Sequence, residues 1–421
     1  MRVIEPTRFD HRTKKKTKKR SRHAFRALFV LFVVAVLVAV GAMRFLSPEQ
    51  YIKNVTKTSS VPGKQVNLAW PSYGQAAVGA RGYKVLAQNG PNKPLPTASI
   101  AKTMTAFAVL REYPLALGEQ GPTITLTTKD VQMYNDYIAK DGSTVAVQAG
   151  EQITEYQALQ ALLLPSANNI ADTLAIWAFG SLEAYVDYAN GLARTLGLEN
   201  THFADASGFS SDTVSTAYDL VLLGESVLMN DVMAEIVSQQ SAVIPVAGTI
   251  RNVNFALGVE GINGIKTGNT EEAGGCFLVS AAHTFPDGQK IVAVAAIQGA
   301  PNLYTALQDT LPLLQSMYKN FGYVPILNAN ETVGTFDVPW QGKLEARAKE
   351  RLDVFTWLGS DVKTIVHLDD LLAPVSSGAV VGRITVNSGI FEHKTDAILS
   401  GEITRPTTNW RVKDIFEVWR R

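Results

Sequence analysis

The chain has 421 residues, of which 46% are hydrophobic and 18% are charged, so it is too long for one ordinary core and too apolar to be disordered. Its formal net charge of +1 hides an asymmetry: residues 1–26 hold 11 Lys or Arg against 2 Asp or Glu, whereas the rest of the chain holds 28 against 36, a net charge of −8. The single cysteine, Cys276, excludes an internal disulfide and a cysteine-based zinc cluster. We therefore expect two folded domains and a targeting segment.

The basic segment 1–26 leads directly into an uncharged apolar stretch, residues 27–43. Seventeen helical residues rise about 26 Å, which is just enough to cross the hydrocarbon core of a bilayer. Because basic residues flank a span on its cytoplasmic side, the sequence predicts a cytoplasmic N-terminus, a single-pass signal-anchor in the cell membrane, and a folded part outside the cytoplasm. The small residues at 40–42 leave a cleaved signal peptide open.

Polar residues 44–66 predict a linker between the membrane and the folded body. From 67 to 322, amphipathic helical stretches such as 155–177 alternate with β-rich runs such as 290–298, which predicts a mixed α/β (α+β) domain. Residues 302–321 read as its last helix.

After Gly322 the chain changes to short alternating segments separated by Gly, Pro and Asp turns. This pattern predicts a small all-β domain over 323–404. The tail, 405–421, contains a possible helix from 409 with apolar residues on one side, which could rest on a membrane surface or pack as a short terminal helix.

The first candidate for chemistry is Ser99-Ile-Ala-Lys102, which opens a helical run to Glu112. A serine and a lysine three residues apart on a helix share a face, and free N–H groups at the helix start favour a developing oxyanion. Lysine can accept the serine proton only when it is neutral, so its pKa must be lowered by burial or by a nearby cation. By itself the motif is weak, because Ser316-Met-Tyr-Lys319 also matches and we interpret that copy, in mid-helix, as structural.

Two further segments carry polar groups suited to a peptide substrate. Ser166 and Asn168 follow a buried helix end that breaks at Pro165, where the serine could relay a proton and the amide could hold a carbonyl. Lys266-Thr-Gly268 lies in a strand-like stretch, where a cation and a hydroxyl could bind a terminal carboxylate and glycine would allow close pairing with a substrate backbone. Each segment alone could equally be a turn or an exposed strand.

Taken in order, these three elements resemble the active-site set of the penicillin-recognising serine enzymes. Their spacing and the neighbouring text, such as 96–106 and 264–274, are similar to the serine-type D-alanyl-D-alanine carboxypeptidases, the low-molecular-mass penicillin-binding proteins. The resemblance covers about residues 75–322 and, more loosely, 323–404. It implies a penicillin-binding, β-lactamase-like catalytic domain, over 67–322, followed by the small β domain.

The resemblance also implies a reaction and its partners. The enzyme would remove the terminal D-Ala from peptidoglycan stem peptides, and β-lactam antibiotics would inhibit it covalently. Carried over by position, Ser99 would form the acyl-enzyme, Lys102 would accept its proton, and Ser166 would assist proton transfer. No cofactor and no metal are implied, and the six histidines show no ligand spacing.

The remaining motif residues are implied to bind the substrate. Asn168 would contact it, Lys266 and Thr267 would hold the terminal carboxylate in the Lys-Thr-Gly268 element, and the backbone N–H groups of Ser99 and Asn269 would form the oxyanion hole. Two departures concern packing: Asn169 stands where an Asp is often found, and Phe209 follows Gly208 where the pattern more often has Leu.

Four other interpretations stay open. A β-lactamase of the same fold would need a deacylating acid, for which Glu199 is the nearest candidate; an endopeptidase would use the same residues on a different bond. A non-catalytic cell-wall-binding protein could keep the fold. The basic N-terminus could bind nucleic acid, which we do not expect, because it ends at an apolar span and the body is acidic.

Overall fold

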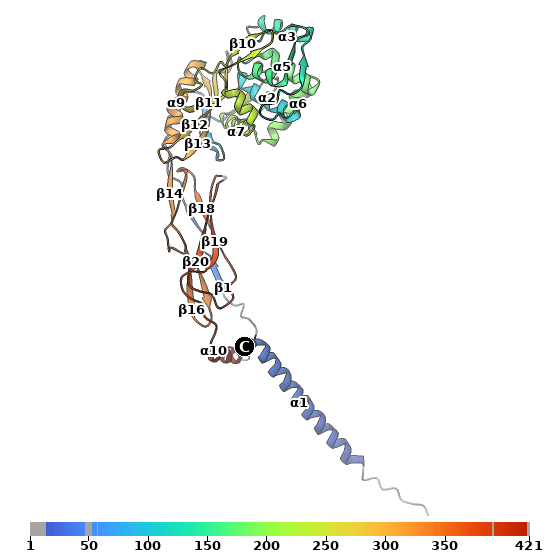
Figure 1. Ribbon diagram of the computed structural model, residues 1–421, viewed down its shortest axis with the longest axis vertical. Coiled ribbons are helices and arrows are strands. Elements are labelled where there is room, and N and C mark those ends of the chain that lie inside the picture. The colour runs from blue at the N-terminus through green and yellow to red at the C-terminus, as the bar shows by residue number, and fades with distance from the viewer. Residues whose placement is uncertain (1–13, 47–52, 57, 390, 419–421) are drawn as a thin grey trace, which may run out of the picture.

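A computed structural model describes residues 14–46, 53–56, 58–389 and 391–418. Figure 1 shows an elongated molecule with a helix-rich body at one end, a slender β unit next to it, and a long helix that projects from the far end of the β unit. That helix, α1 (Lys14–Leu46), carries the basic residues from Lys14 onward and the apolar stretch predicted as a span.

The body is built on a five-stranded antiparallel sheet with the order β11-β12-β13-β3-β4. Its strands are β3 (Gln75–Ala80), β4 (Lys84–Asn89), β11 (Ile262–Thr270), β12 (Gly274–Thr284) and β13 (Lys290–Ala300). Side chains on both faces of β12 and β13 are buried, because helices cover each face, and this explains their nearly continuous apolar sequence. The strand β11 lies at the edge of the sheet.

One face of this sheet carries most of the helices, and the other carries α9 (Leu303–Tyr318). The helices of the first face are α2 (Lys102–Glu112), α3 (Thr128–Ile138), α4 (Glu155–Leu163), α5 (Asn168–Phe179), α6 (Leu182–Thr195), α7 (Ala217–Leu228) and α8 (Asp231–Ser238). Short 3-10 helices and two-stranded pairs complete the body: β5 (Leu95–Pro96) with β8 (Val214–Ser215), β6 (Thr123–Thr125) with β7 (Gln152–Thr154), β9 (Ser241–Ile244) with β10 (Gly248–Arg251), η1 (Ala98–Ala101) and η2 (Val259–Gly261).

Local sequence explains where several of these helices begin and end. Thr154 caps α4 with a capping box to Gln157, and Asn302 caps α9. The helical stretch 155–177 is divided into two helices at the break predicted for Pro165. Proline has no N–H with which to continue the helix, and Ser166 after it adopts a left-handed φ of 68°.

The β unit has its own apolar core, formed by residues between Val324 and Ile403. Its seven-stranded sheet has the order β1-β15-β16-β20-β19-β18-β2, and β14 pairs with β17 beside it. The strands are β1 (Lys53–Thr56), β2 (Ser59–Val61), β14 (Phe321–Leu327), β15 (Thr332–Val338), β16 (Gly342–Ala348), β17 (Leu352–Trp357), β18 (Val362–Leu368), β19 (Val380–Ser388) and β20 (Phe391–Leu399).

The segment 44–66, expected to be a linker, supplies two of these strands. β1 pairs with β15 and β2 pairs with β18, so they form the two outer strands of the seven-stranded sheet. Short strands of this kind carry little periodicity and form only because a partner edge is present, which is why the sequence did not predict them.

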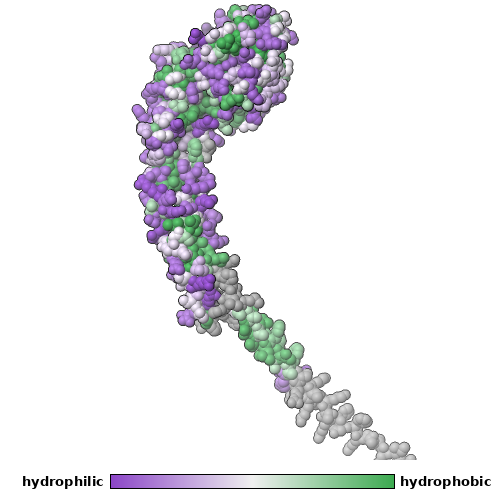
Figure 2. Space-filling view, viewed as in Figure 1, coloured by the Kyte–Doolittle hydropathy of each residue, from purple (hydrophilic) through white to green (hydrophobic). Residues whose placement is uncertain are grey.

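Both chain ends carry a helix on the side of the β unit away from the body (Figure 1). The last helix, α10 (Thr408–Val418), occupies the predicted tail, and the Trp410 ring meets the Trp340 ring at 5.5 Å. Val412 is exposed, whereas the side chains of the other apolar residues predicted for this helix lie outside the described residues. In Figure 2 the coloured part of α1 is apolar over most of its length and hydrophilic at the end away from the β unit.

Candidate active site

The predicted nucleophile, Ser99, lies in η1, which continues directly into α2 at Lys102. Two glycines allow other segments to pack closely on this turn. A Cβ on Gly208 would stand 1.9 Å from the Ala98 carbonyl oxygen, and one on Gly268 would stand 3.2 Å from the Ser99 amide nitrogen. Ala98 itself has a left-handed φ of 46°, an uncommon conformation for alanine that this packing holds in place.

Lys102 is fully buried, and its amine has three neighbours. Its Nζ lies 2.8 Å from Ser99 Oγ, 2.6 Å from Asn168 Oδ1 and 2.9 Å from the Ser207 carbonyl oxygen. The Asn168 and Ser207 carbonyl oxygens can only accept hydrogen bonds, so each takes one N–H of the amine. When Lys102 is neutral, its lone pair is therefore free to face the Ser99 hydroxyl. This geometry suits proton transfer from the serine hydroxyl.

Burial lowers the pKa of Lys102 to about 7, against the opposing effect of the carboxylates of Asp205 and Asp172. A substantial fraction of the amine is therefore neutral near pH 7, as a general base requires. Burial also lowers the pKa of Lys266, and the nearby Lys102 lowers it further.

Ser166 and Asn168 lie at the break between α4 and α5, with Asn168 as the first residue of α5. The Ser166 hydroxyl is buried and has no hydrogen-bond partner among the described residues, in a backbone conformation that serine seldom adopts. A buried hydroxyl left unsatisfied is costly, which fits the predicted role of Ser166 in proton transfer. The Asn168 side-chain oxygen binds Lys102, so the structure shows it holding the base, in addition to any substrate contact.

The Lys-Thr-Gly element lies in the middle of β11, on the strand whose outer edge faces no other strand of this sheet. Lys266 and Thr267 are buried, and Lys266 Nζ donates to the Thr267 carbonyl oxygen at 3.0 Å. Asn269 follows, opposite Gly275. A buried lysine without a carboxylate partner among the described residues lacks a countercharge, which an incoming carboxylate would supply.

Sequence reasoning did not predict the contact of Lys102 with the turn at residues 205–209. The Asp205 carboxylate accepts hydrogen bonds from the Gly208 and Phe209 amides and from the Thr213 hydroxyl, which fixes the turn that presents the Ser207 carbonyl to Lys102. A main-chain carbonyl leaves no residue-type signal, so only the Asp-x-x-Gly turn chemistry could have indicated it.

A buried carboxylate, Asp172, was also missed. It lies one turn after Asn168 on α5 and accepts a hydrogen bond from the Tyr137 hydroxyl at 2.9 Å. Burial raises its pKa to about 6.

The departure noted at Asn169 concerns packing, because its amide binds both backbone groups of Val145.

The Ser316-Met-Tyr-Lys319 match lies far from this cluster in the fold. Ser316 is within α9, where its hydroxyl donates to the Leu313 carbonyl and accepts from the Ala69 amide. Both hydrogen bonds agree with the prediction that this copy is structural.

Comparison with known proteins agrees with this arrangement. Residues 74–297, more than half of the chain, match the family model described as D-alanyl-D-alanine carboxypeptidase. The chain belongs to this family. Its predicted recognition and its enzyme class, a serine-type D-alanyl-D-alanine carboxypeptidase, are therefore confirmed.

Individual relatives extend the match beyond the catalytic body. The chain is 25% identical to the D-alanyl-D-alanine carboxypeptidase DacF of Bacillus subtilis, over 72% of this chain and 78% of the relative. It is 32% identical to a D-alanyl-D-alanine endopeptidase of Pseudomonas aeruginosa, over 47% and 62%. The crystal structure of penicillin binding protein 5 from Haemophilus influenzae aligns with a TM-score of 0.54 at 18% identity, covering 82% of this chain and all of that one. The carboxypeptidase thus has the predicted fold class, a penicillin-binding α+β body followed by a small β unit.

Proposed function

We propose that the carboxypeptidase removes the terminal D-Ala from peptidoglycan stem peptides through an acyl-enzyme on Ser99. In the first step neutral Lys102 takes the hydroxyl proton while Ser99 Oγ bonds to the carbonyl carbon of the penultimate D-Ala. The C–N bond then breaks, and the leaving amine of the terminal D-Ala receives a proton. Water attacks the ester in the second step and releases the shortened peptide and the serine.

The observation that carries this proposal is the 2.8 Å contact between Lys102 Nζ and Ser99 Oγ, made by a buried lysine with a lowered pKa. It gives the chain an activated nucleophile without a histidine. Ser166, whose buried hydroxyl lacks a partner among the described residues, would carry the proton between the amine and the leaving group.

The substrate would lie along the open edge of β11. Lys266 and Thr267 would bind the terminal carboxylate, and Asn168 would contact the peptide as well as Lys102. Gly268 allows the strand to approach the nucleophile, so that the backbone N–H groups of Ser99 and Asn269 would stabilise the oxyanion. The same groups make acylation by β-lactams the expected mode of inhibition.

We further propose that the protein is held in the cell membrane by its N-terminal helix, with the active site outside the cytoplasm. The segment Arg22–Ala42 of α1 is long and apolar enough to cross a bilayer, with a mean hydropathy of 2.6. The basic residues before it favour a cytoplasmic N-terminus. The division of the chain into 1–26, 27–43, 44–66, 67–322, 323–404 and 405–421 stays a prediction. Its segment 44–66 contains β1 and β2, which pair with strands of the β unit.

An assay of D-alanine release tests the proposal on the full chain in detergent, with a pentapeptide ending in D-Ala-D-Ala. We expect Ser99→Ala to abolish release, and Ser316→Ala, the matched change in another Ser-x-x-Lys copy, to keep it. Release that survives Ser99→Ala would contradict the assigned nucleophile.

An endopeptidase is the second candidate, because a named endopeptidase is among the relatives. The same preparation given a cross-linked peptide dimer would yield monomers if the chain cleaves cross-links.

A β-lactamase is less well supported: Glu199, its candidate deacylating acid, lines a surface pocket with Arg194 and His202. Rapid turnover of penicillin would reverse that ranking.

A further inference from the structure

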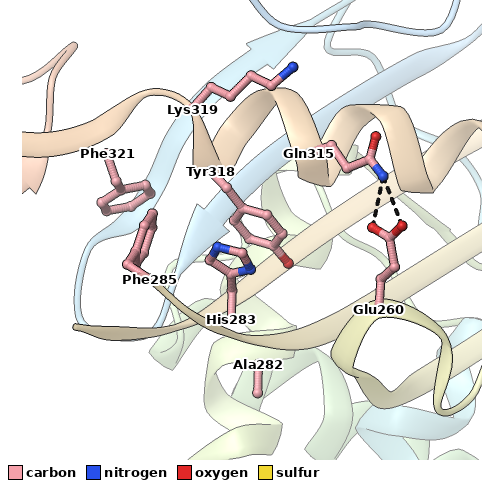
Figure 3. Close-up of a pocket in the computed structure, with 8 residues that line it drawn as sticks. All are labelled: Glu260, Ala282, His283, Phe285, Gln315, Tyr318, Lys319 and Phe321. Carbon is pink, nitrogen blue, oxygen red and sulfur yellow. Dashed lines mark hydrogen bonds between the residues drawn. The ribbon is translucent and has the colours of Figure 1, made fainter. Parts of the chain in front are cut away.

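A second pocket lies on the α9 face of the sheet, near the junction with the β unit. It has a volume of about 720 Å³. It is lined by Glu260, Ala282, His283, Phe285, Gln315, Tyr318, Lys319 and Phe321, drawn in Figure 3. These residues come from η2, from β12 and the loop after it, from the last turn of α9, and from the start of β14.

The pocket is separate from the active site. Lys266 pairs with Leu278 across β11 and β12, and His283 lies five residues further along β12. At about 3.4 Å per residue this is roughly 17 Å along the strand. The predicted chemistry uses none of the pocket's side chains.

Tyr318 provides the first sign of a ligand. Its side chain is 7% exposed, and its hydroxyl has no hydrogen-bond partner among the described residues. Burial, with the nearby Glu260 carboxylate, raises its pKa, so the hydroxyl keeps its proton and can donate. In Figure 3 this hydroxyl points toward the side of the pocket where Glu260 lies. A buried donor without a partner is costly unless a ligand or water satisfies it.

Glu260 and Gln315 form a polar rim beside this hydroxyl. Gln315 Nε2 lies 2.9 and 2.8 Å from the two Glu260 carboxylate oxygens, so the amide holds the carboxylate in place. Glu260 has a left-handed φ of 46°, an uncommon conformation that concentrates at ligand sites. Each carboxylate oxygen keeps lone pairs that can accept further hydrogen bonds.

The floor of the pocket is aromatic. The His283 and Tyr318 rings are stacked at 4.0 Å with an angle of 9° between their planes. Phe285 meets the edge of His283 at 4.7 Å, and Phe321 lies beside Phe285 in Figure 3. Flat aromatic faces next to planar hydrogen-bonding groups suit a ring with one apolar face and several hydroxyl or amide groups.

Charge and shape favour a neutral segment of a polymer over a small ion. The Glu260 carboxylate disfavours an anion, while the Lys319 side chain is directed away from Glu260 in Figure 3. Glu260, Gln315 and Lys319 are exposed, so the pocket is shallow and would let a chain enter and leave at its ends.

We propose that this pocket binds a pyranose unit of the peptidoglycan glycan strand, an N-acetylated amino sugar, as a contact separate from catalysis. The inference rests on the carboxypeptidase function proposed above. A second contact on the same polymer raises the effective concentration of stem peptides at Ser99 without changing the reaction itself.

Binding is tested with the β-1,4-linked N-acetylglucosamine trimer and the full chain in detergent, followed by ligand-observed NMR. We expect Tyr318→Phe, which keeps the ring, to weaken binding about 3- to 10-fold, and Glu260→Gln to weaken it in the same direction. Tyr304→Phe removes an exposed hydroxyl at the other end of α9 and is the matched control, with unchanged affinity. No binding by the unaltered protein, or equal affinity in all variants, overturns the proposal.

Activity separates this inference from the proposed function. Tyr318→Phe should release D-alanine from the soluble pentapeptide at the unaltered rate but more slowly from intact peptidoglycan sacculi. Equal rates on sacculi would overturn the second contact while leaving the carboxypeptidase intact. If the unaltered protein releases no D-alanine from the pentapeptide, the proposed function itself is refuted.

Discussion

Burial lowers the pKa of the Lys102 amine, and two nearby carboxylates, Asp205 and Asp172, partly offset this effect. Asp172 has a pKa of about 6, so above that pH it is charged and raises the pKa of Lys102. Asp205, Lys140 and Lys266 act on the same pair from neighbouring segments. The activity of a neutral base should therefore rise with pH through about 7.

Replacing Asp172 with Asn should move this rise in activity to lower pH by about one unit, since one nearby negative charge is removed from a poorly solvated amine. The acylation rate constant with penicillin, measured from pH 5 to 9, reports the shift. Asp136→Asn, an exposed change on α3, serves as control. An unchanged profile, or a shift to higher pH, would show that Asp172 does not act on Lys102.

Glu155 makes a pH-dependent contribution to stability away from the active site. It is fully buried, and neither carboxylate oxygen has a hydrogen-bond partner among the described residues. Burial raises its pKa to about 7. The folded state therefore binds a proton that the unfolded state has released between about pH 4.5 and 7, so the free energy of unfolding falls as pH rises through this window.

Glu155→Gln should remove this loss, making the protein more stable than the unaltered chain at pH 8 by up to about 3 kcal/mol. At pH 5 the two should be similar. Thermal unfolding at both pH values measures the difference. Glu183→Gln provides the control, because Glu183 also lies in the first turn of a helix but is exposed. Equal melting temperatures at pH 8 would refute the argument.

At the scale of elements, the site depends on how closely β11 approaches η1. Only glycine at 268 leaves room, since a Cβ there would stand 2.8 Å from the Thr97 carbonyl oxygen. The break between α4 and α5 is equally necessary, because it places Asn168 at the start of α5, where its side-chain oxygen accepts from Lys102. These two arrangements bring the start of α2, the start of α5 and the edge strand β11 together, and each motif lies on one of them.

Gly268→Ala should push β11 away from the nucleophile and lower the penicillin acylation rate at least tenfold, while the protein stays folded. The rate and the circular dichroism spectrum together test this. In Gly191→Ala, within α6, the new Cβ would meet only Arg194 at 3.8 Å, so acylation should be unchanged. A full rate in Gly268→Ala would mean that the close approach is unnecessary.

At the scale of the whole molecule, the β unit lies between the catalytic body and the apolar helix (Figure 1). Its outer strands, β1 and β2, come from the segment that joins this helix to the body. The segment therefore does more than link, because it completes the sheet and covers the edges of β15 and β18.

A fragment that starts at residue 67 should consequently be less stable in its β unit, and more prone to associate, than one that starts at residue 47. Calorimetry and size-exclusion chromatography compare the two. Both should release D-alanine from the soluble pentapeptide, because the active site lies in the other unit. Equal melting and equal association would show that β1 and β2 contribute little.

The sequence by itself determined the apolar helix, the order of an α/β body and a β unit, and the three motifs proposed to form the active site. Periodicity, charge and short spacings are local properties of the chain, so they can be recognised without knowledge of the fold. The helix break at Pro165 was likewise local, whereas the edge strands β1 and β2 depend on partners far away in the chain.

Tertiary structure alone decided which atoms surround Lys102. The Ser207 carbonyl carries no residue-type signal, and Asp172 looks like any polar position of a helix until burial gives it an effect on the amine. The pocket at Tyr318 was invisible for the same reason, since its walls come from four separate segments. Burial and long-range contact set these properties, and neither can be read from neighbouring residues.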